Sequence, residues 1–494
     1  MKRISSIFST AYFSISLILT IATVTGAMSI TSPKTLHKYV APSFARAFFR
    51  NIPTHKLRIA NLPTPIHQVE PYEYNDLGSG KGSGSSKTSI LQPLWDLNIT
   101  LLMKRDDMSG GVELGGNKIR KLEFLLADAL QEQNNEDGTG SRKCDAVVTI
   151  GGEQSNHCRA TAAACRMVGL EPHLILRTRR ANQVEKAKIE ENEDTFGYIG
   201  NVMFDRMVGA HIHMCTPGEY GRFGNKALVE RVCRDIETES SSSSSSKKKR
   251  KAYPIPVGGS NAMGTWGYID AVDELVQQLK IGENTSTSDD DGGDDKSDLY
   301  ESIDHIVFAC GSGGTATGIT LGIGLAYYEL NEQPPRVHAV GVCDDPDYFY
   351  AEIESIGNEM GLELTTKSLT RSLSSNDSSI SSSIMEFVKG LVQIHQGKGL
   401  GYASSTQEEL DFIAEFALET GVVLDPVYSG KALYQFIKEV MNKPEEFRNS
   451  RIMFWHTGGS LGVYDKIDAL APSLERLSGI SRMDVYGKKM VGDD

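Results

Sequence analysis

The feature that most constrains the fold is an alternation of short apolar runs with longer amphipathic segments. The apolar runs are too short for buried helices and predict strands at residues 146–150, 173–176, 255–257, 305–309, 337–342 and 452–455. Apolar residues at three- and four-residue spacings predict helices at residues 118–130, 156–168, 265–279, 315–325, 407–420 and 431–441. This order predicts an α/β fold in which helices connect parallel strands.

Four glycine-rich loops stand where predicted strands end or predicted helices begin, at residues 114–118, 151–157, 258–264 and 311–315. Ligands of parallel α/β sheets bind beyond the carboxyl ends of the strands, next to helix N-termini. One glycine-rich loop is weak evidence of a site. Four of them in one chain predict a pocket built largely from backbone amides.

The loop formed by Gly311, Ser312, Gly313, Gly314 and Thr315 suits a phosphate group. Its glycines allow close approach of the backbone, the helix N-terminus offers free N–H groups, and the two hydroxyls add donors. The loop lacks the Gly-Lys-Ser/Thr ending of a nucleotide-binding P-loop and the GxGxxG pattern of dinucleotide sites. We therefore expect a small phosphorylated cofactor, with a simple tight turn as the alternative.

Two lysines and a polar loop could supply chemistry. Lys118 begins a predicted helix, where the positive helix end and nearby cations favour a neutral amine able to form a Schiff base, and Lys121 lies one turn later as a fixed charge. Ser155 and Asn156 could hold a carboxylate or a ring hydroxyl. The alternatives are a solvated helix end for the lysines and an ordinary helix N-cap for the polar loop.

Five strings occur in an order typical of one enzyme family: Gly115-Gly-Asn-Lys-Ile-Arg-Lys-Leu-Glu123, Gln154-Ser-Asn-His157, Ile255-Pro-Val-Gly-Gly-Ser-Asn261, Asp425-Pro-Val-Tyr-Ser-Gly-Lys431 and His456-Thr-Gly-Gly459. From about residue 94 to 464 the chain resembles the aminocyclopropane-carboxylate deaminase and D-cysteine desulfhydrase family of pyridoxal-phosphate enzymes. The resemblance implies the two-lobed α/β fold of the tryptophan synthase β-subunit (fold type II). Residues 70–120 plus 258–480 would form a large cofactor-binding lobe and residues 121–257 a small lobe.

The resemblance also implies roles for the cofactor residues. Lys118 would bind pyridoxal 5'-phosphate covalently, and Lys121 with the loop from Gly311 to Thr315 would bind its phosphate. Asn156 would meet the ring hydroxyl and Tyr428 would stack on the ring.

Substrate roles follow from the same resemblance. Ser155, Asn156 and His157 would receive the substrate carboxylate, and Tyr402 would lie near the substrate, although its segment departs from the commoner family strings at Leu400 and Ala403. Either the Lys118 amine or the Ser155 hydroxyl would act as the catalytic base.

Ser429 and Thr457 distinguish the branches of the family. Related deaminases carry Glu and Leu at these positions, whereas desulfhydrases carry small hydroxyl residues, as this chain does. A hydroxyl near the pyridine nitrogen would leave the ring a weaker electron sink, suited to elimination of a good leaving group. Both residues would contact the cofactor, and Thr457 also the substrate.

The expected function is therefore pyridoxal-phosphate-dependent D-cysteine desulfhydrase, a carbon-sulfur lyase that converts D-cysteine to pyruvate, ammonia and hydrogen sulfide. 1-Aminocyclopropane-1-carboxylate deaminase is the alternative within the family. From a different class, a non-catalytic protein could bind a phosphorylated metabolite through the loop at Gly311–Thr315. Family members are usually homodimers, so a homodimer that binds a small amino acid is expected.

Composition excludes other classes. The chain has 494 residues and a net charge of −13, which argues against nucleic-acid binding. Its seven cysteines are scattered without a CxxC pair, so neither a metal site nor a disulfide framework is predicted.

The N-terminus resembles a targeting leader, expected to span residues 1–69. Lys2 and Arg3 precede an apolar stretch at residues 11–28, and no acidic residue occurs before Glu70. This composition favours an organelle, either a mitochondrion or a plastid, with no stable membrane association after the leader is removed. The alternative is a retained membrane-anchoring helix.

Polar segments rich in Ser, Gly, Asp and Asn interrupt the pattern at residues 75–87, 131–143, 238–251, 282–297 and 368–383. They cannot bury enough apolar surface to offset the entropy of ordering. We expect them to be disordered insertions within one fold.

Overall fold

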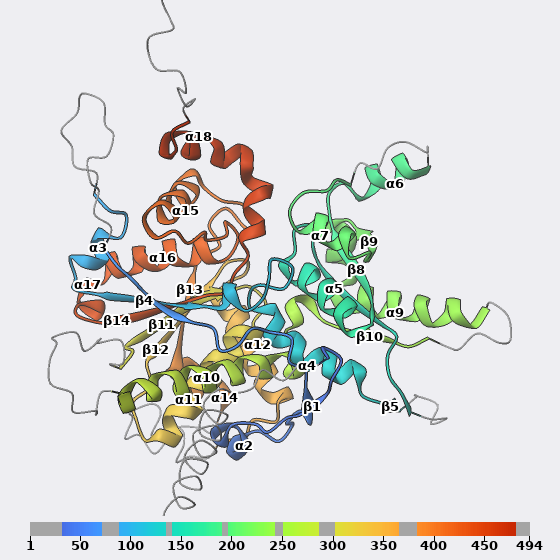
Figure 1. The fold of residues 1–494 in the computed structure, drawn as a ribbon, viewed down its shortest axis with the longest axis horizontal. Coiled ribbons are helices and arrows are strands. Elements are labelled where there is room, and N and C mark those ends of the chain that lie inside the picture. Colours follow the sequence, from blue (N-terminus) through green and yellow to red (C-terminus); the bar gives the residue numbers. More distant parts are fainter. Residues whose placement is uncertain are drawn as a thin grey trace, which may run out of the picture.

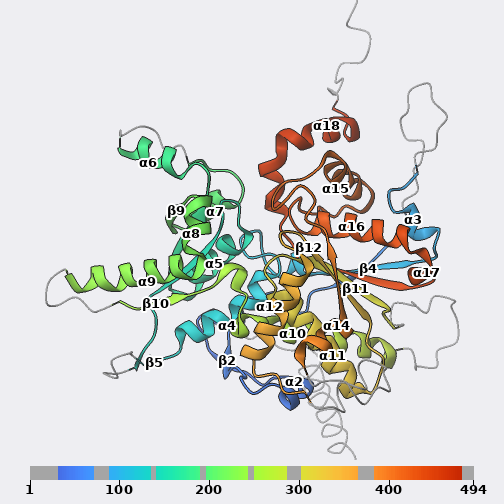
Figure 2. The ribbon, with the colours of Figure 1, turned by 180° about the vertical axis from the view of Figure 1, so that it is seen from behind.

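The computed structural model describes residues 32–71, 88–134, 141–189, 196–242, 250–285, 302–364 and 383–480. Two sheets of different size form the cores of two lobes, which lie side by side in Figure 1 and, seen from behind, in Figure 2. Among the described helices, none is long and apolar enough to cross a membrane.

The larger sheet has the strand order β13-β12-β11-β14-β4-β3, parallel except for the pair β3 and β4. Its strands are β3 (Ile66–Val69), β4 (Thr100–Arg105), β11 (His305–Cys310), β12 (Arg336–Gly341), β13 (Val392–Gln396) and β14 (Arg451–His456). Every residue of the central strands β11 and β14 is buried. Strands covered on both faces read as continuous apolar runs, which explains why the sequence indicated both of them.

Helices cover both faces of this sheet. Ile306 and Phe308 of β11 share one apolar cluster with α10 (Ala262–Thr285), α11 (Gly314–Leu330), α12 (Pro346–Glu359) and α14 (Ile384–Leu391). Val307 and Ala309 point to the opposite face, as the two-residue period of a strand requires. There they pack with α3 (Gln92–Trp95), α15 (Gln407–Thr420), α16 (Ser429–Asn442) and α17 (Pro444–Phe447), beyond which α18 (Ile467–Leu477) packs on α15.

The smaller sheet is entirely parallel, in the order β10-β7-β8-β9. It comprises β7 (Ala146–Gly152), β8 (Glu171–Arg177), β9 (His211–Cys215) and β10 (Ala252–Pro254). The helices of this lobe are α5 (Asn156–Val168), α6 (Ala181–Ile189), α7 (Asn201–Met207), α8 (Pro217–Phe223) and α9 (Asn225–Ser242). Helix α4 (Lys118–Leu130) packs against both α5 and α10 and so connects the two lobes.

The expected leader boundary at residue 69 is wrong for residues 32–69, which belong to the folded unit. They form β1 (His37–Lys38), α2 (Ser43–Phe48), β2 (His55–Lys56) and β3. Tyr39, Phe44 and Phe49 are buried in the core, where Tyr39 and Phe49 pack edge-on against Trp266. Large aromatic residues buried in this way contribute to folding stability. Residues 1–31 lie outside the described residues.

The predicted strand at residues 255–257 is also wrong. β10 ends at Pro254, and a 3-10 turn, η2 (Val257–Gly259), follows with Gly258 at a φ of 66°. Pro254 and Pro256 have no N–H to donate to a sheet. Ile255 is nevertheless fully buried, and its N–H still donates to the Val148 carbonyl of β7 at 2.8 Å, so the backbone hydrogen bonding with β7 ends at this residue.

The five expected insertions lie mainly outside the described residues. Where the structure describes them, helices and strands extend into their predicted bounds. Within 131–143, β5 (Gln133–Asn134) pairs with β6 (Ser141–Arg142). α9 extends into the serine run as far as Ser242, and α10 continues to Thr285. A helix that is anchored by packing extends past the point where its apolar pattern stops.

Candidate active site

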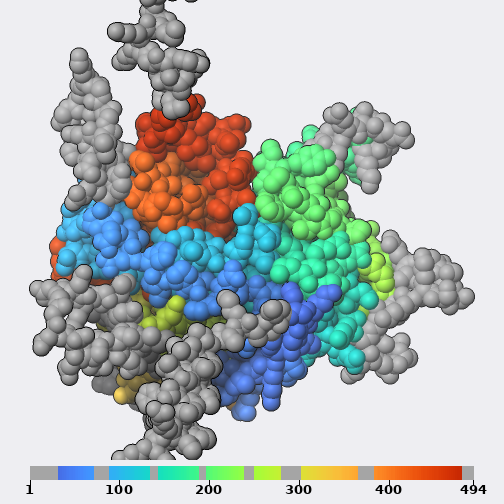
Figure 3. Space-filling view, in the orientation of Figure 1, coloured from blue at the N-terminus to red at the C-terminus, as the bar shows by residue number. Residues whose placement is uncertain are grey.

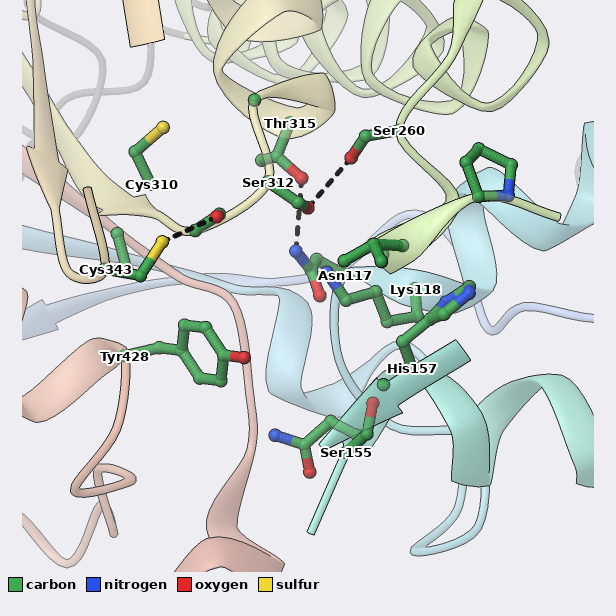
Figure 4. Close-up of a pocket in the computed structure, with 18 of the residues that line it drawn as sticks. Asn117, Lys118, Ser155, His157, Ser260, Cys310, Ser312, Thr315, Cys343 and Tyr428 are labelled. Atoms are coloured by element: carbon green, nitrogen blue, oxygen red, sulfur yellow. Dashed lines mark hydrogen bonds between the residues drawn. The ribbon is translucent and has the colours of Figure 1, made fainter. Parts of the chain in front are cut away.

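A cavity of about 710 Å³ lies between the lobes, at the carboxyl ends of β7, β11 and β14. Residues of all four glycine-rich loops line it, as expected from their positions at strand ends. In Figure 3 the green small lobe and the red C-terminal elements lie side by side. Figure 4 shows the side chains that face the cavity.

Lys118 is the first residue of α4 and lines the cavity. Its backbone is fixed by the preceding residue, because the Asn117 N–H donates to the Thr457 carbonyl at 3.0 Å. Burial lowers the pKa of Lys118 to about 8, and nearby Cys310 opposes this shift slightly. At neutral pH the amine is therefore far closer to its neutral form than an exposed lysine would be.

Lys121 lies one helical turn later, behind the loop at residues 311–315, which we call the phosphate-type loop. Its Nζ donates to the Gly258 carbonyl at 3.2 Å and to Ser260 Oγ at 3.1 Å. Ser260 Oγ also pairs with Ser312 Oγ at 2.8 Å and accepts from the Gly314 N–H at 3.2 Å. Burial, followed by the charge of Lys118, lowers the pKa of Lys121 well below its ordinary value. An anion in the adjacent loop would stabilise its charged form.

The loop at residues 311–315 presents the N-terminus of α11 to the cavity. Gly313 has a φ of 80°, a conformation that favours glycine. A Cβ on Gly311 would lie 2.8 Å from Tyr428 Cε1, so only glycine allows the ring to approach this closely. Thr315 Oγ1 accepts from Asn117 Nδ2 at 3.1 Å, which ties this loop to the start of α4 (Figure 4).

The loop between β7 and α5 supplies polar atoms from the small lobe. Ser155 is the N-cap of α5, and its Oγ accepts a hydrogen bond from the Cys158 N–H at 3.2 Å. The alternative interpretation of this loop, an ordinary helix N-cap, is therefore correct for Ser155. Asn156 Oδ1 and His157 Nδ1 are buried atoms without a hydrogen-bond partner in the described part of the chain. Burial, then the charges of the two site lysines, lowers the pKa of His157 well below its ordinary value. The His157 ring is therefore neutral at pH 7.

Two tyrosines form the wall contributed by the large lobe. The Tyr402 and Tyr428 hydroxyls lie 2.9 Å apart, and both side chains line the cavity. Burial raises the pKa of each phenol, so both stay protonated at neutral pH.

Thr457 lines the cavity, whereas Ser429 does not. Ser429 is fully buried, and its Oγ donates to Asp425 Oδ1 at 2.6 Å and accepts from the Asp425 N–H at 2.9 Å. Its hydroxyl therefore contacts a carboxylate within the large lobe.

The structure brings most of the predicted site residues to one cavity: Lys118, Ser155, Asn156, His157, Gly311, Ser312, Gly313, Thr315, Tyr402, Tyr428 and Thr457. Lys121 and Gly314 lie directly behind this lining, joined to it through Ser260. Ser429 lies deeper.

Sequence reasoning missed several residues of the site. Ser260 and Asn117 lie in strings that the resemblance singled out, and Cys343 follows a predicted strand, but no role was assigned to them. Cys343 Sγ contacts the Gly311 carbonyl at 2.9 Å. Arg177, at the end of β8, lines the cavity and packs over the Tyr402 ring. The sequence feature that could have indicated Arg177 is its position directly after a predicted strand.

A buried ionic network anchors the start of α4. Arg120 Nη2 lies 2.8 Å from Asp106 Oδ1 and 2.9 Å from Glu274 Oε1, and Lys104 Nζ lies 2.5 Å from the same Glu274 atom. Burial alone would raise the pKa of Asp106, but the charge and hydrogen bonds of Arg120 bring it down to about 2. The network holds the first turn of α4, and with it Lys118, in place.

Comparisons with known proteins agree with this geometry. The family model for pyridoxal-phosphate dependent enzymes matches residues 89–458. A mitochondrial bifunctional D-cysteine desulfhydrase/1-aminocyclopropane-1-carboxylate deaminase of Arabidopsis thaliana is 39% identical over 90% of this chain and 88% of its own. A putative 1-aminocyclopropane-1-carboxylate deaminase of Thermotoga maritima is 32% identical over 74% of this chain and 90% of its own.

Among solved structures, a homologue of 1-aminocyclopropane-1-carboxylate deaminase is similar with a TM-score of 0.58 at 24% identity, over 88% of this chain and 100% of that one. This likeness shows the fold, which is the predicted two-lobed α/β fold of fold type II. The chain belongs to the family of pyridoxal-phosphate dependent enzymes.

Proposed function

We propose that Lys118 binds pyridoxal phosphate covalently and that the loop at residues 311–315, with Lys121 behind it, binds its phosphate. The fit rests on observations of this cavity. An amine with a lowered pKa lines the same cavity as a helix N-terminus, and the buried Asn156 Oδ1 lacks a partner that a ring hydroxyl would supply. Tyr428 offers an aromatic surface beside Gly311.

When bound, pyridoxal phosphate withdraws electrons from the α-carbon of an amino acid and so makes the α-proton acidic. Lys118 is our preferred base for this proton, because its pKa of about 8 lies near the working pH. Ser155 remains the other candidate, with its oxygen already accepting the Cys158 N–H. The N–H groups and side chains of Ser155, Asn156 and His157 are proposed to receive the substrate carboxylate.

The activity that this site supports best is α,β-elimination from D-cysteine. One D-cysteine and one water give one pyruvate, one ammonia and one hydrogen sulfide, after loss of the α-proton and of sulfide from Cβ. The observation that carries the proposal is that Lys118 and the phosphate-type loop line one cavity, in a chain similar to a bifunctional desulfhydrase/deaminase. The names of the relatives favour deamination of 1-aminocyclopropane-1-carboxylate as a second activity.

Borohydride reduction tests the site. The reduced full-length protein should carry the cofactor on the peptide containing Lys118, and sulfide release from D-cysteine should exceed that from L-cysteine. A label on Lys121, or no label on any peptide, would overturn the assignment of the lysine. Phosphate-dependent ligand binding that survives Lys118→Ala, together with no sulfide release by the wild-type protein, would favour the non-catalytic alternative.

We propose that residues 1–31 direct the chain to an organelle, in line with the mitochondrial location in the name of the Arabidopsis relative. A fluorescent protein fused to this segment should co-localise with a mitochondrial marker. We also propose a homodimer, which light scattering of the purified protein would test.

A further inference from the structure

A group of histidines and a glutamate lies on the small lobe, away from the cavity. Glu171 and His173 belong to β8, and His211 and His213 to β9 (Figure 1). His173 and His211 are direct partners in the parallel pair, and alternate residues of a strand point to the same face. These side chains therefore gather on one face at the start of the two strands.

One carboxylate oxygen lies at the centre of the group. Glu171 Oε1 lies 2.6 Å from His211 Nε2 and 3.4 Å from His173 Nε2. The other oxygen of Glu171 pairs with Arg250, which fixes the carboxylate and turns Oε1 toward the histidines. The three ligand atoms all lie within 4.8 Å of one another.

His173 provides the second observation. Its side chain is only 7% exposed, and Nε2 has no hydrogen-bond partner in the described part of the chain. Its other nitrogen, Nδ1, lies 3.1 Å from His213 Nε2. In the tautomer whose Nδ1–H donates to His213, the Nε2 atom keeps its lone pair beside the Glu171 oxygen 3.4 Å away, and these two atoms together can bind a cation.

We propose that Glu171, His173 and His211 bind a divalent transition-metal ion, and that His213 orients His173 through its second nitrogen. Two imidazoles and one carboxylate form a ligand set typical of Zn²⁺, with a water as the fourth ligand. Zinc bonds of about 2.0–2.1 Å require neighbouring ligands roughly 3.4 Å apart, so the His211 ring must shift by about 1 Å. This shift is accessible because the His211 side chain is 55% exposed.

The role of the metal would be structural. Glu171 begins β8 and Arg177, which lines the cavity, ends it, so the two ends are about 20 Å apart at ~3.3 Å per residue. An ion at this position would tie the edge strand β9 to β8 without contacting the cavity. The sequence prediction that the chain holds no metal would then need correction.

The test measures zinc affinity of the full-length protein with its cofactor bound, by competition with a chromophoric chelator. The wild-type protein should bind one zinc ion per chain, and His211→Ala should remove this binding. His213→Ala, which removes the orienting partner of His173, should weaken this zinc binding roughly 10–100-fold. His67→Ala, on an exposed histidine of the large sheet, is the matched control and should bind like the wild type.

X-ray absorption separates this site from the cysteines. The zinc should show nitrogen and oxygen neighbours near 2.0–2.1 Å and no sulfur near 2.3 Å. Zinc should also raise the melting temperature of the wild type but not of His211→Ala, while sulfide release is the same in both. No zinc binding by the wild type, equal binding by His211→Ala, or sulfur neighbours would each overturn the proposal.

Discussion

Replacing Ser429 by alanine tests whether this hydroxyl acts on Asp425 rather than on the cofactor. Asp425 is fully buried, and its Oδ1 accepts from the Ser429 hydroxyl at 2.6 Å and from the Ser429 N–H at 2.7 Å. A hydrogen bond to a charged group contributes about 1.5–3 kcal/mol. Ser429→Ala should therefore lower the free energy of unfolding at pH 7 by about this amount.

The loss should depend on pH. Burial raises the pKa of Asp425, and the hydrogen bonds from Ser429 oppose this rise. A carboxyl whose pKa is higher in the folded than in the unfolded state costs stability as the pH rises between the two values. Removing the Ser429 donor raises the folded pKa further, so the destabilisation should be larger at pH 7 than below the ordinary pKa of Asp425, where the carboxyl is protonated in both states.

Urea unfolding of the cofactor-bound protein at several pH values measures this difference. Ser450→Ala is the matched control, because the buried Ser450 hydroxyl donates to the neutral Phe447 carbonyl. That substitution should cost about 0.5–1.5 kcal/mol at every pH. A pH-independent loss of unfolding free energy for Ser429→Ala, or unchanged stability with an altered cofactor spectrum, would refute the reasoning. Either result would indicate that Ser429 acts on the cofactor.

Other expectations follow from the same contacts. Because Lys118 has a pKa of about 8, cofactor attachment to the cofactor-free protein should speed up to about pH 8 and then level off in stopped-flow absorbance, whereas a rise continuing to pH 10 would contradict this. Gly311→Ala should weaken cofactor binding in equilibrium dialysis, since its Cβ would lie 2.8 Å from Tyr428. Arg120→Met should cost about 3–5 kcal/mol in urea unfolding, because it removes the ion-pair partner of the buried Asp106 carboxylate. Thr457→Leu should keep the cofactor but lower the ratio of D-cysteine elimination to aminocyclopropane-carboxylate deamination, and an unchanged ratio would show that Thr457 only fills space.

Local signals mark both ends of two helices whose bounds were predicted to the residue. The structure has α5 and α15 at the predicted residues 156–168 and 407–420. Ser155 caps the start of α5 and Gly169 ends it in a left-handed conformation, while Thr406 and Gly421 do the same for α15. These signals act within a few residues, so the sequence contains them directly.

Strands at the margins of the sheets were missed because their patterns are mixed. β9 carries two histidines on its partly exposed face, and β13 mixes buried residues with two exposed glutamines over five positions. Such short mixed patterns lack the continuous apolar run of a central strand. Pairing with β8 and β12 stabilises them, and that pairing is a property of the folded chain.

The family strings predicted which loops meet, but not which atoms bond. Lys121 and Ser260 are 139 residues apart in sequence, yet Ser260 joins the lysine to the phosphate-type loop. The contact between Ser429 and Asp425 spans only four residues, but it depends on burial that removes water from both groups. Burial of this kind depends on the whole fold, so the sequence alone favoured the cofactor as the partner of Ser429.

The first turn of α4 explains why one short string contains so much of the site. Successive residues of a helix point about 100° apart, so Lys118 faces the cavity, Arg120 faces the ionic network of Asp106 and Glu274, and Lys121 faces the loop beneath the phosphate position. Each direction meets a different part of the protein, because α4 lies between the two lobes. A substitution at any of these positions therefore changes stability and cofactor binding together. Assigning a catalytic role to one of them requires that folding free energy and cofactor content be measured on the same variant as its activity.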